Sequence, residues 1–403
     1  MMSEDATRVE SAAPRPMPWL LIWSTCLATF TVTASGATRT PFLVDMSRDL
    51  DTSLAMVANL FGFTSIAWGL ASFAAGIGSD IVGRRPFLVG APLALTGAMV
   101  GVAACYSFYS VAAWAILGGG ICGLFTGVSM AEVAGGVGER QRGRALGWVM
   151  AGQSMTLLVG VPLASWIGAS VGWRGVSYCV ALMAVFSALA MFSTTAVPLQ
   201  KARPTGATKR KPVLRTALTP SVLRLLGSVI AERICFGLAA IYYATFMLQT
   251  YGLSLEVLAI PLMIFAVGNV LGTIVGGQLA DRLRNRVLIF AAALTASGIV
   301  ALFLFGWPVG VPISTALGFG YMFANAVARP SLMAALSNVP NEVRGTVLGL
   351  NSTAASAGWL TAAALGGWIL SAVGFSGFGP LAGILALLGA FLAIIGGNKK
   401  GVA

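Results

Sequence analysis

The chain has 403 residues, of which 57% are hydrophobic and only 9% are charged. A soluble domain carries about 25% charged residues because water must wet its surface, so this composition excludes a soluble enzyme, a disordered tail and a disulfide scaffold. The net charge of +12 leaves nucleic-acid binding to be tested against the positions of the charges. Histidine is absent and the five cysteines lie in apolar runs without a CxxC spacing, so no metal site is expected.

Twelve apolar runs follow one another along the chain. A helix needs roughly 20 mainly apolar residues to cross a hydrocarbon core about 30 Å thick. The sequence therefore predicts an all-α integral membrane protein with twelve transmembrane helices. The predicted spans are 18–43, 53–78, 86–106, 109–136, 144–168, 174–197, 221–247, 254–279, 286–307, 311–336, 346–371 and 376–397.

The loops between these runs differ in positive charge. With the N-terminus placed in the cytoplasm, 20 of the 25 Lys and Arg residues fall on the cytoplasmic side. Lys and Arg accumulate in cytoplasmic loops of membrane proteins, so both termini are predicted to be cytoplasmic. The same asymmetry explains the net charge and removes nucleic acid as a partner.

Three matches at one offset indicate an internal duplication. Asp80 and Asp281 are 201 residues apart, and the segments 142–147 and 170–173 resemble 344–349 and 372–375 at an offset of 202. A repeat of this length predicts two pseudo-symmetric six-helix bundles. The predicted division is an N-terminal tail at 1–17, bundles at 18–197 and 221–397, a cytoplasmic linker at 198–220 and a C-terminal tail at 398–403.

A motif after the second run carries a family resemblance. It consists of Gly76, Asp80, Gly83, Arg84 and Arg85, with Ile81 where an arginine is usual, and its half-repeat is Gly277, Asp281 and Arg282. The chain resembles a twelve-helix member of the major facilitator superfamily. That resemblance implies a gating role for these residues. It also implies that Glu132 pairs with Arg84 or Arg85 and locks an outward-open state, while Asp80 faces the N-terminus of the eleventh span.

The fifth span points to export. Gly152, Gly160 and Pro162, followed by Gly172-Trp173-Arg174, are similar to the antiporter-associated motif of the drug and sugar exporter-like, DHA1-type branch, although Val161 splits the usual Gly-Pro pair. Two features depart from the antiporter pattern. Gly119 occupies the position of the usual fourth-span arginine, and the first span has no acid. The usual assignment of coupling residues therefore does not carry over.

Three charges lie deep within the predicted spans, namely Glu232, Arg233 and Arg329. Such groups cost about 2.5–3.5 kcal/mol each to insert and usually mark transport pathways. Glu232 lies seven residues from Leu225 and Arg329 seven from Leu336, so both are predicted to lie about 10 Å from the cytoplasmic edge. By resemblance, spans 1, 4, 7 and 10 line a central cavity, and the three charges are expected to share one depth in it. One reading is that an arginine binds an anionic or carbonyl-bearing solute while Glu232 exchanges protons. The other is a permanent ion pair that holds the bundle together, with either arginine as the partner.

Further candidates lie on the same spans. Tyr243 shares the helix face of Glu232, and Asn325 lies one turn from Arg329. Arg39 has two readings, a substrate contact or a side chain that snorkels to the outer surface. The acids of the outer segment are expected to be solvated; they are Asp45, Asp49 and Asp51.

Together these features predict a secondary transporter that moves a small organic solute by alternating access, with proton-coupled efflux favoured. Proton-coupled uptake of an organic anion or a sugar is the alternative. An integral membrane enzyme and a non-transporting sensor are distant alternatives. No cofactor, metal, nucleic acid or ATP site is expected, because no phosphate-binding motif is present. The expected partners are the lipid bilayer, the solute and protons, and the expected location is the inner (plasma) membrane of a bacterium.

Overall fold

All secondary structure in the described residues is helical. The computed structural model describes residues 17–195, 218–283, 285–339 and 341–397. The predicted tails and most of the predicted linker lie outside these ranges. The first group of elements is α1 (Trp19–Ala37), η1 (Thr40–Phe42), α2 (Leu43–Asp49), α3 (Leu54–Val82), α4 (Arg85–Ala104), α5 (Phe108–Gly136), α6 (Glu139–Met155), the π-helical η2 (Thr156–Gly160) and α7 (Val161–Thr194). The second group is α9 (Pro220–Tyr251), α10 (Leu255–Arg282), α11 (Arg286–Gly306), α12 (Val311–Leu336), α13 (Asn341–Ala372), η3 (Phe375–Gly377) and α14 (Phe378–Gly397).

Ten segments of the described chain are long and apolar enough to cross a membrane. One of them, Gln141–Thr194, has 54 residues, which is about 80 Å at 1.5 Å per residue and more than twice the hydrocarbon thickness. The chain turns within it at Gly172, whose φ of 67° lies in the left-handed region that favours glycine. The predicted spans 144–168 and 174–197 therefore run together in α6, η2 and α7, with the turn at Gly172 between them.

Short side chains begin several helices. Ser53, Thr219, Ser254 and Asn285 each accept a hydrogen bond from the backbone N–H three residues later. These N-cap bonds satisfy backbone donors that the first helical turn leaves free. They fix where α3, α9, α10 and α11 begin.

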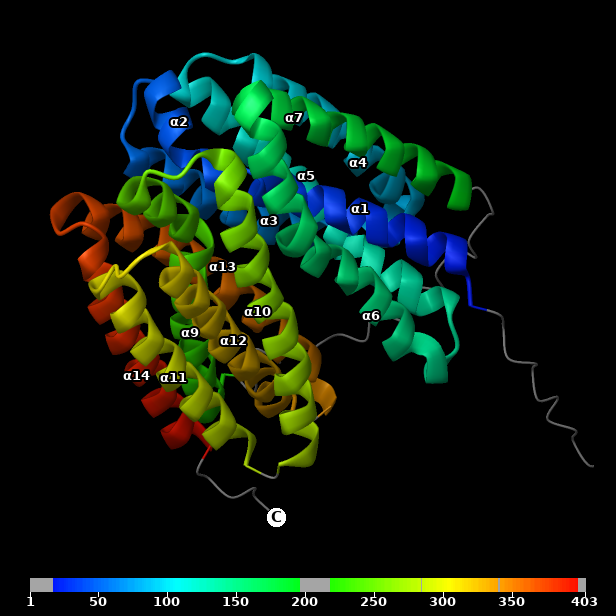
Figure 1. Ribbon diagram of the computed structural model, residues 1–403. Helices are drawn as coiled ribbons and strands as arrows, with labels where there is room; N and C mark the ends of the chain where they lie inside the picture. Colours follow the sequence, from blue (N-terminus) through cyan, green and yellow to red (C-terminus); the bar gives the residue numbers. More distant parts are fainter. Residues whose placement is uncertain (1–16, 196–217, 284, 340, 398–403) are drawn as a thin grey trace, which may run out of the picture.

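The helix packing repeats between the two groups (Figure 1). In the first, α3 packs along α5 and α4 along α7; in the second, α10 packs along α12 and α11 along α14. Glycines allow the close approach in both places. A Cβ added at Gly123 of α5 would meet the carbonyl of Trp68 on α3, and one at Gly272 of α10 would meet the carbonyl of Phe323 on α12.

The two groups touch along α3 with α13 and along α7 with α10. The α3–α13 contact is tight near the start of α3, where a Cβ at Gly62 would lie 2.6 Å from Leu360 Cδ1, but a Cβ at Gly76 near the end of α3 would meet nothing within 4 Å. At the same end, Ser165 Oγ donates to the carbonyl of Leu255 at 2.6 Å, and η1 packs on α9. Among the described residues, the close contacts between the two groups therefore lie toward the end that holds η1, called the closed end below, and Gly76 at the opposite end makes none.

Candidate functional site

The buried charges of α9 and α12 form one cluster. Arg329 of α12 donates to Glu232 Oε1 of α9 from Nη2 and Nε, at 3.3 and 3.4 Å. Arg233 Nε lies 3.1 Å from the other carboxylate oxygen, Oε2, as an ion pair without hydrogen-bond alignment. Glu232 therefore pairs with both arginines, and the choice that the sequence left open between them does not arise.

Exposure differs sharply within this cluster. The side chain of Glu232 is 1% exposed, whereas those of Arg233 and Arg329 are 17% and 25% exposed. The carboxylate is thus buried deeper than the guanidinium groups that bind it. One negative charge between two positive charges leaves the cluster with a net positive charge, carried by its more exposed members.

Aromatic rings complete this surface. The guanidinium carbon atoms of Arg329 and Arg233 lie 4.6 and 5.7 Å from the ring centroid of Phe236, within range of a cation–π interaction. Trp359 of α13 packs edge-on against Phe236 at 5.5 Å. Phe236 lies on the helix face that the sequence predicts for Glu232, whereas Trp359 is a residue that sequence reasoning missed. The cluster can offer an anion two guanidinium groups and can offer an apolar group the nearby rings.

Asn325 and Tyr243 lie apart from the ion pairs. Asn325 is fully buried on α12, and neither polar atom of its side chain has a hydrogen-bond partner among the described residues. Tyr243 stacks on Phe265 with ring centroids 4.5 Å apart and donates to the Ser314 carbonyl at 3.4 Å. A second missed residue, Tyr321, lies one turn from Asn325 on α12 and donates to the Cys235 carbonyl at 2.6 Å.

Arg39 does not reach the outer surface. It follows the end of α1 and precedes η1, and it is only 8% exposed. Its guanidinium lies within electrostatic range of the Cys122 thiol on α5, and Cys122 contacts Ser35 of α1 at 3.3 Å. Of the two readings that the sequence left open, snorkelling is therefore wrong for this conformation.

The predicted gate residues are only partly brought together. Arg84 Nη1 lies 3.3 Å from Glu132 Oε2, and it also donates to the Ala131 carbonyl at 3.2 Å. Arg85 instead places its guanidinium over the Phe192 ring at 5.1 Å. Gly83 ends α3 with a φ of 91°.

The remaining gate residues show no such contacts. In the described part of the chain, Asp281 and Arg282 form no ion pair. The side chain of Asp80 lies outside the described residues. Of the predicted gate residues, the structure therefore brings together Arg84 and Glu132. Their role in locking an outward-open state stays a prediction.

The fifth-span motif lies against α1. A Cβ at Gly152 would meet the carbonyl of Cys26, and one at Gly160 would lie 3.2 Å from the Phe30 ring. Pro162 follows the π-helical turn η2 after one residue, Val161. Proline lacks an N–H and crowds the carbonyl four residues earlier, which accounts for the widened turn. Because η2 also contacts α10, the motif lies where the two groups of helices meet.

One expectation about the outer segment is incomplete. The Asp49 side chain is 44% exposed, as expected, but it also accepts hydrogen bonds through Oδ2 from Trp173 Nε1 at 2.9 Å and Arg174 Nη1 at 2.6 Å. Arg174 also stacks on Trp173 and Tyr106. The Trp173-Arg174 pair therefore fastens the end of α2 to the turn within α7. Sequence proximity gives no signal for this contact, because 124 residues separate Asp49 from Trp173.

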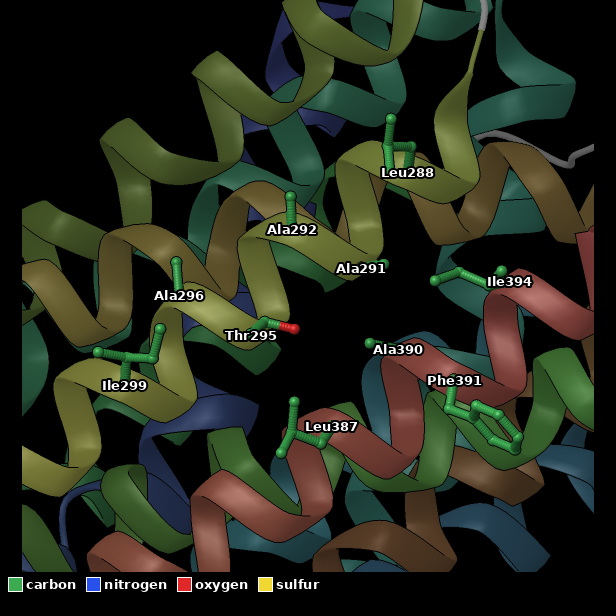
Figure 2. Close-up of a pocket in the computed structure, with 10 residues that line it drawn as sticks. All are labelled: Leu288, Ala291, Ala292, Thr295, Ala296, Ile299, Leu387, Ala390, Phe391 and Ile394. Atoms are coloured by element: carbon green, nitrogen blue, oxygen red, sulfur yellow. The ribbon is translucent and has the colours of Figure 1, made fainter.

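A groove elsewhere on the molecule is not a site for a polar solute. It measures about 620 Å³ and lies between α11 and α14, where it is lined by alanine, leucine, isoleucine and Phe391, with Thr295 as its polar residue (Figure 2). Among the described residues, no group of three His, Cys, Asp or Glu side chains could hold a metal ion.

Comparison with known proteins identifies the family. The sequence profile of the Major Facilitator Superfamily matches residues 25–339 and 225–400. The chain belongs to this superfamily. It is 28% identical to the inner membrane transport protein YdhP of Escherichia coli O157:H7, over 69% of this chain and 70% of that protein. It is 27% identical to the chloramphenicol resistance protein of Streptomyces lividans, over 56% of this chain and 55% of that protein.

A solved structure shares the superfamily fold. A bacterial homologue of the human lysosomal transporter Spinster, in an inward-facing and unoccupied conformation, superposes with a TM-score of 0.69 at 13% identity, covering 95% of this chain and 96% of that one. The chain is therefore a multi-pass integral membrane protein of a superfamily of secondary transporters, and its relatives are bacterial. Transport of a small solute, rather than catalysis, is the activity that this membership supports.

Proposed function

We propose that this superfamily member exports a small organic solute in exchange for protons, by alternating access between two six-helix bundles. The observation that carries the proposal is the buried Glu232–Arg233–Arg329 cluster, in a molecule whose described close contacts between the two helix groups are concentrated toward the closed end. A buried charge cluster of this kind costs stability and is often replaceable by apolar packing. Its retention on cavity-lining helices therefore favours a role in transport.

The proposed topology has twelve spans with both termini in the cytoplasm. Gly172 separates the fifth span from the sixth, and the 32-residue α13 is the eleventh span. Under the positive-inside distribution of Lys and Arg, the end opposite the closed end faces the cytoplasm. Residues 18–197 and 221–397 then form the two bundles that move relative to each other about the solute site.

Glu232 is the proposed proton-exchanging group. In this conformation one carboxylate oxygen is held by Arg329 and the other lies beside Arg233. A movement that separated α12 from α9 would remove one counter-charge and, in this proposal, allow the carboxylate to exchange a proton. Proton binding would thus be linked to conformation.

Export is favoured over uptake by two observations. The Gly152, Gly160 and Pro162 motif lies at the contact of η2 with α10, and one relative is a chloramphenicol resistance protein. Uptake of an organic anion or sugar remains the alternative, because Arg233 and Arg329 present positive charge. Both directions use the same cluster.

Proteoliposomes with an imposed pH gradient separate the two directions. An antiporter accumulates solute on the acidic side and a symporter on the alkaline side, whatever the orientation of the protein. A panel that includes chloramphenicol serves as the set of probes, with lumenal pH followed by a trapped dye. We expect accumulation on the acidic side together with solute-dependent proton movement.

The variant Glu232→Gln tests the proton role. We expect it to lose proton-driven accumulation while retaining exchange of labelled for unlabelled solute, because exchange requires no net proton transfer. Glu256→Gln is the control, since Glu256 is exposed in the first turn of α10. Accumulation by Glu232→Gln with an unchanged pH dependence would rule out Glu232 as the proton carrier.

A further inference from the structure

Arg39 is a buried cation without a counter-ion. It is 8% exposed, and among the described residues no carboxylate lies within 4.0 Å of its guanidinium and no hydrogen bond involves its side chain. A guanidinium carries five N–H donors and remains charged in proteins. Charged residues within membrane spans are functional candidates by default. Arg39 therefore differs from Arg84, Arg174 and Arg329, which all have acidic partners.

The buried Arg39 side chain lies within electrostatic range of Cys122 on α5. Side chains at a helix terminus lean toward the N-terminal end of that helix, and this direction leads from Arg39 to Ser35 and Cys122. Cys122 follows the first residue of α5 by 14 residues, about 21 Å, and Arg329 follows the first residue of α12 by 18 residues, about 27 Å. Both helices start at the closed end, so the two positions differ in depth by about one helical turn.

Positive charge is therefore in excess on both helix groups at similar depth. The Glu232 cluster carries one net positive charge in the second group, and Arg39 adds another in the first. Among the acids whose side chains the structure describes in the first group, none offsets Arg39: Glu132 is held by Arg84, and Asp49 is held by Arg174. Asp45 and Asp51 lie on the outer segment without an ion pair to Arg39.

We infer that the transported solute is an organic dianion, with one acidic group bound by Arg39 and the other by Arg233 and Arg329. Phe236 and Trp359 beside the arginines suit a solute with an apolar or aromatic body between its acidic groups. Guanidinium groups bind carboxylates through paired hydrogen bonds. A solute that joins one residue of each helix group also links its own binding to the movement of the groups. This inference rests on the proposed transport function and names the solute class.

Binding to the purified full-length protein tests the solute class without transport. The probes are terephthalate, benzoate and terephthalamide, which carry two, one and no negative charges on the same ring. The readout is the shift of the thermal unfolding midpoint with probe concentration. We expect terephthalate to stabilise the protein at the lowest concentration, benzoate only at higher concentration, and terephthalamide not at all.

Arg39→Gln should weaken terephthalate binding at least tenfold. It should also reduce the ratio of the affinity for terephthalate to the affinity for benzoate. Arg48→Gln is the matched control, because Arg48 is an exposed arginine of α2 that loses the same charge; its binding should stay unchanged. Arg39→Lys keeps the charge and is used if Arg39→Gln does not fold. It should retain preference for the dianion but with lower affinity, because lysine lacks the paired donors.

Two results would overturn the inference: equal stabilisation by terephthalamide and terephthalate, or unchanged terephthalate binding in Arg39→Gln. Proton-driven accumulation of a neutral or cationic probe by Arg39→Gln would also overturn it while leaving the transport function intact. Conversely, dianion binding that depends on Arg39, without any proton-coupled movement across the panel, would contradict proton-coupled transport and not the solute class.

Discussion

The buried charges of this protein fall into two kinds at the scale of single residues. Glu232 is enclosed by two arginines, and removing it would leave both guanidinium groups without their anion; breaking such a buried cluster typically costs about 3–5 kcal/mol. Arg39 has no such partner in the described chain. The first arrangement satisfies its charges internally, and the second leaves a charge for a ligand.

Asp49 should be the stability-determining acid of the outer segment. In Asp49→Asn the amide oxygen can take the place of Oδ2 and accept both hydrogen bonds, but the side chain loses the charge that binds Arg174. A hydrogen bond to a charged group is stronger than one between neutral groups. We expect a loss of about 1 kcal/mol in the free energy of unfolding, measured as a lower thermal midpoint in detergent.

Asp51→Asn is the matched control for that substitution. Asp51 belongs to the same outer segment and makes no ion pair or side-chain hydrogen bond among the described residues, and its φ of 46° is one that asparagine tolerates well. Its midpoint should stay within the error of the wild type. Equal midpoints for the two variants would show that the charge of Asp49 beside Arg174 contributes nothing to stability.

Contacts between single residues could be predicted from the sequence where the depth of each residue within its span was enough to decide them. Glu232 and Arg329 sit at matching distances from the ends of their helices, so counting residues along two spans was sufficient to bring them together. Arg39 and Asp49 could not be resolved in this way. The burial of Arg39 depends on how α5 and η1 close over it, and the partner of Asp49 comes from a turn far along the chain.

At the scale of elements, glycine seams set how closely helices approach. In α5, Gly119, Gly123 and Gly127 face the backbone of α3, and in α10 Gly268, Gly272 and Gly276 face the backbone of α12. The same device thus appears in both helix groups. The glycine series of α5 can be read from the sequence, but the sequence does not show that α3 is the helix packed against it.

Gly123→Ala should disturb this seam. The added Cβ would overlap the Trp68 carbonyl, and backbone cannot move aside as a flexible side chain can. Overpacking costs about 1–3 kcal/mol, which outweighs the gain of about 1 kcal/mol from replacing glycine by alanine in a helix. We expect a lower thermal midpoint and less monodisperse protein on size-exclusion chromatography.

Gly120→Ala makes the same change on the neighbouring face of α5. Its Cβ would meet only Ala71 Cβ, at 4.0 Å, which is an ordinary contact. This variant should be as stable as the wild type or slightly more so. If both alanine variants unfolded at the same temperature, close approach of α3 to α5 would not be the reason for the glycine.

The segment formed by α6, η2 and α7 shows which structural features a hydropathy profile does not detect. The run of apolar residues through α6, η2 and α7 predicts two spans, yet the helix passes through a π-helical turn before Pro162 and turns only at Gly172. Hydropathy measures apolar content and does not register the hydrogen-bond shift that proline causes. Glycine and proline positions, rather than polarity, carry that information in this segment.

At the scale of the whole molecule, the contact between α3 and α13 is close toward the closed end and favours the present conformation. Along α3, Gly62 lies against Leu360 of α13, whereas Gly76 faces open space at the opposite end. The two glycines are 14 residues apart, about four helical turns, and so share one face of the helix. An alternating-access movement would exchange their environments, with Gly76 becoming the close contact.

Substitutions at these two glycines should shift the conformational equilibrium in opposite directions. Gly62→Val overpacks the closed end against Leu360 and penalises the present conformation by about 1–3 kcal/mol, a shift of roughly 5–150-fold between the two states. Gly76→Val leaves this conformation unchanged and penalises the alternative one. Pulsed electron–electron double resonance measures the distance between two spin labels. One pair of labels, at the exposed positions Tyr109 and Val309, reports on the closed end, and a second pair, at the exposed Ile81 and Leu283, reports on the opposite end.

Opposite signs are the decisive outcome, because destabilisation alone cannot produce them. For Gly62→Val the distance between labels 109 and 309 should lengthen while that between labels 81 and 283 shortens. For Gly76→Val the distance between labels 109 and 309 should stay the same or shorten, and that between labels 81 and 283 should stay the same or lengthen. If Gly62→Val only broadened both distance distributions, the contact between α3 and α13 would be ordinary packing within one rigid body. If it moved the two ends oppositely, α3 and α13 would be the surfaces along which the two helix groups rock.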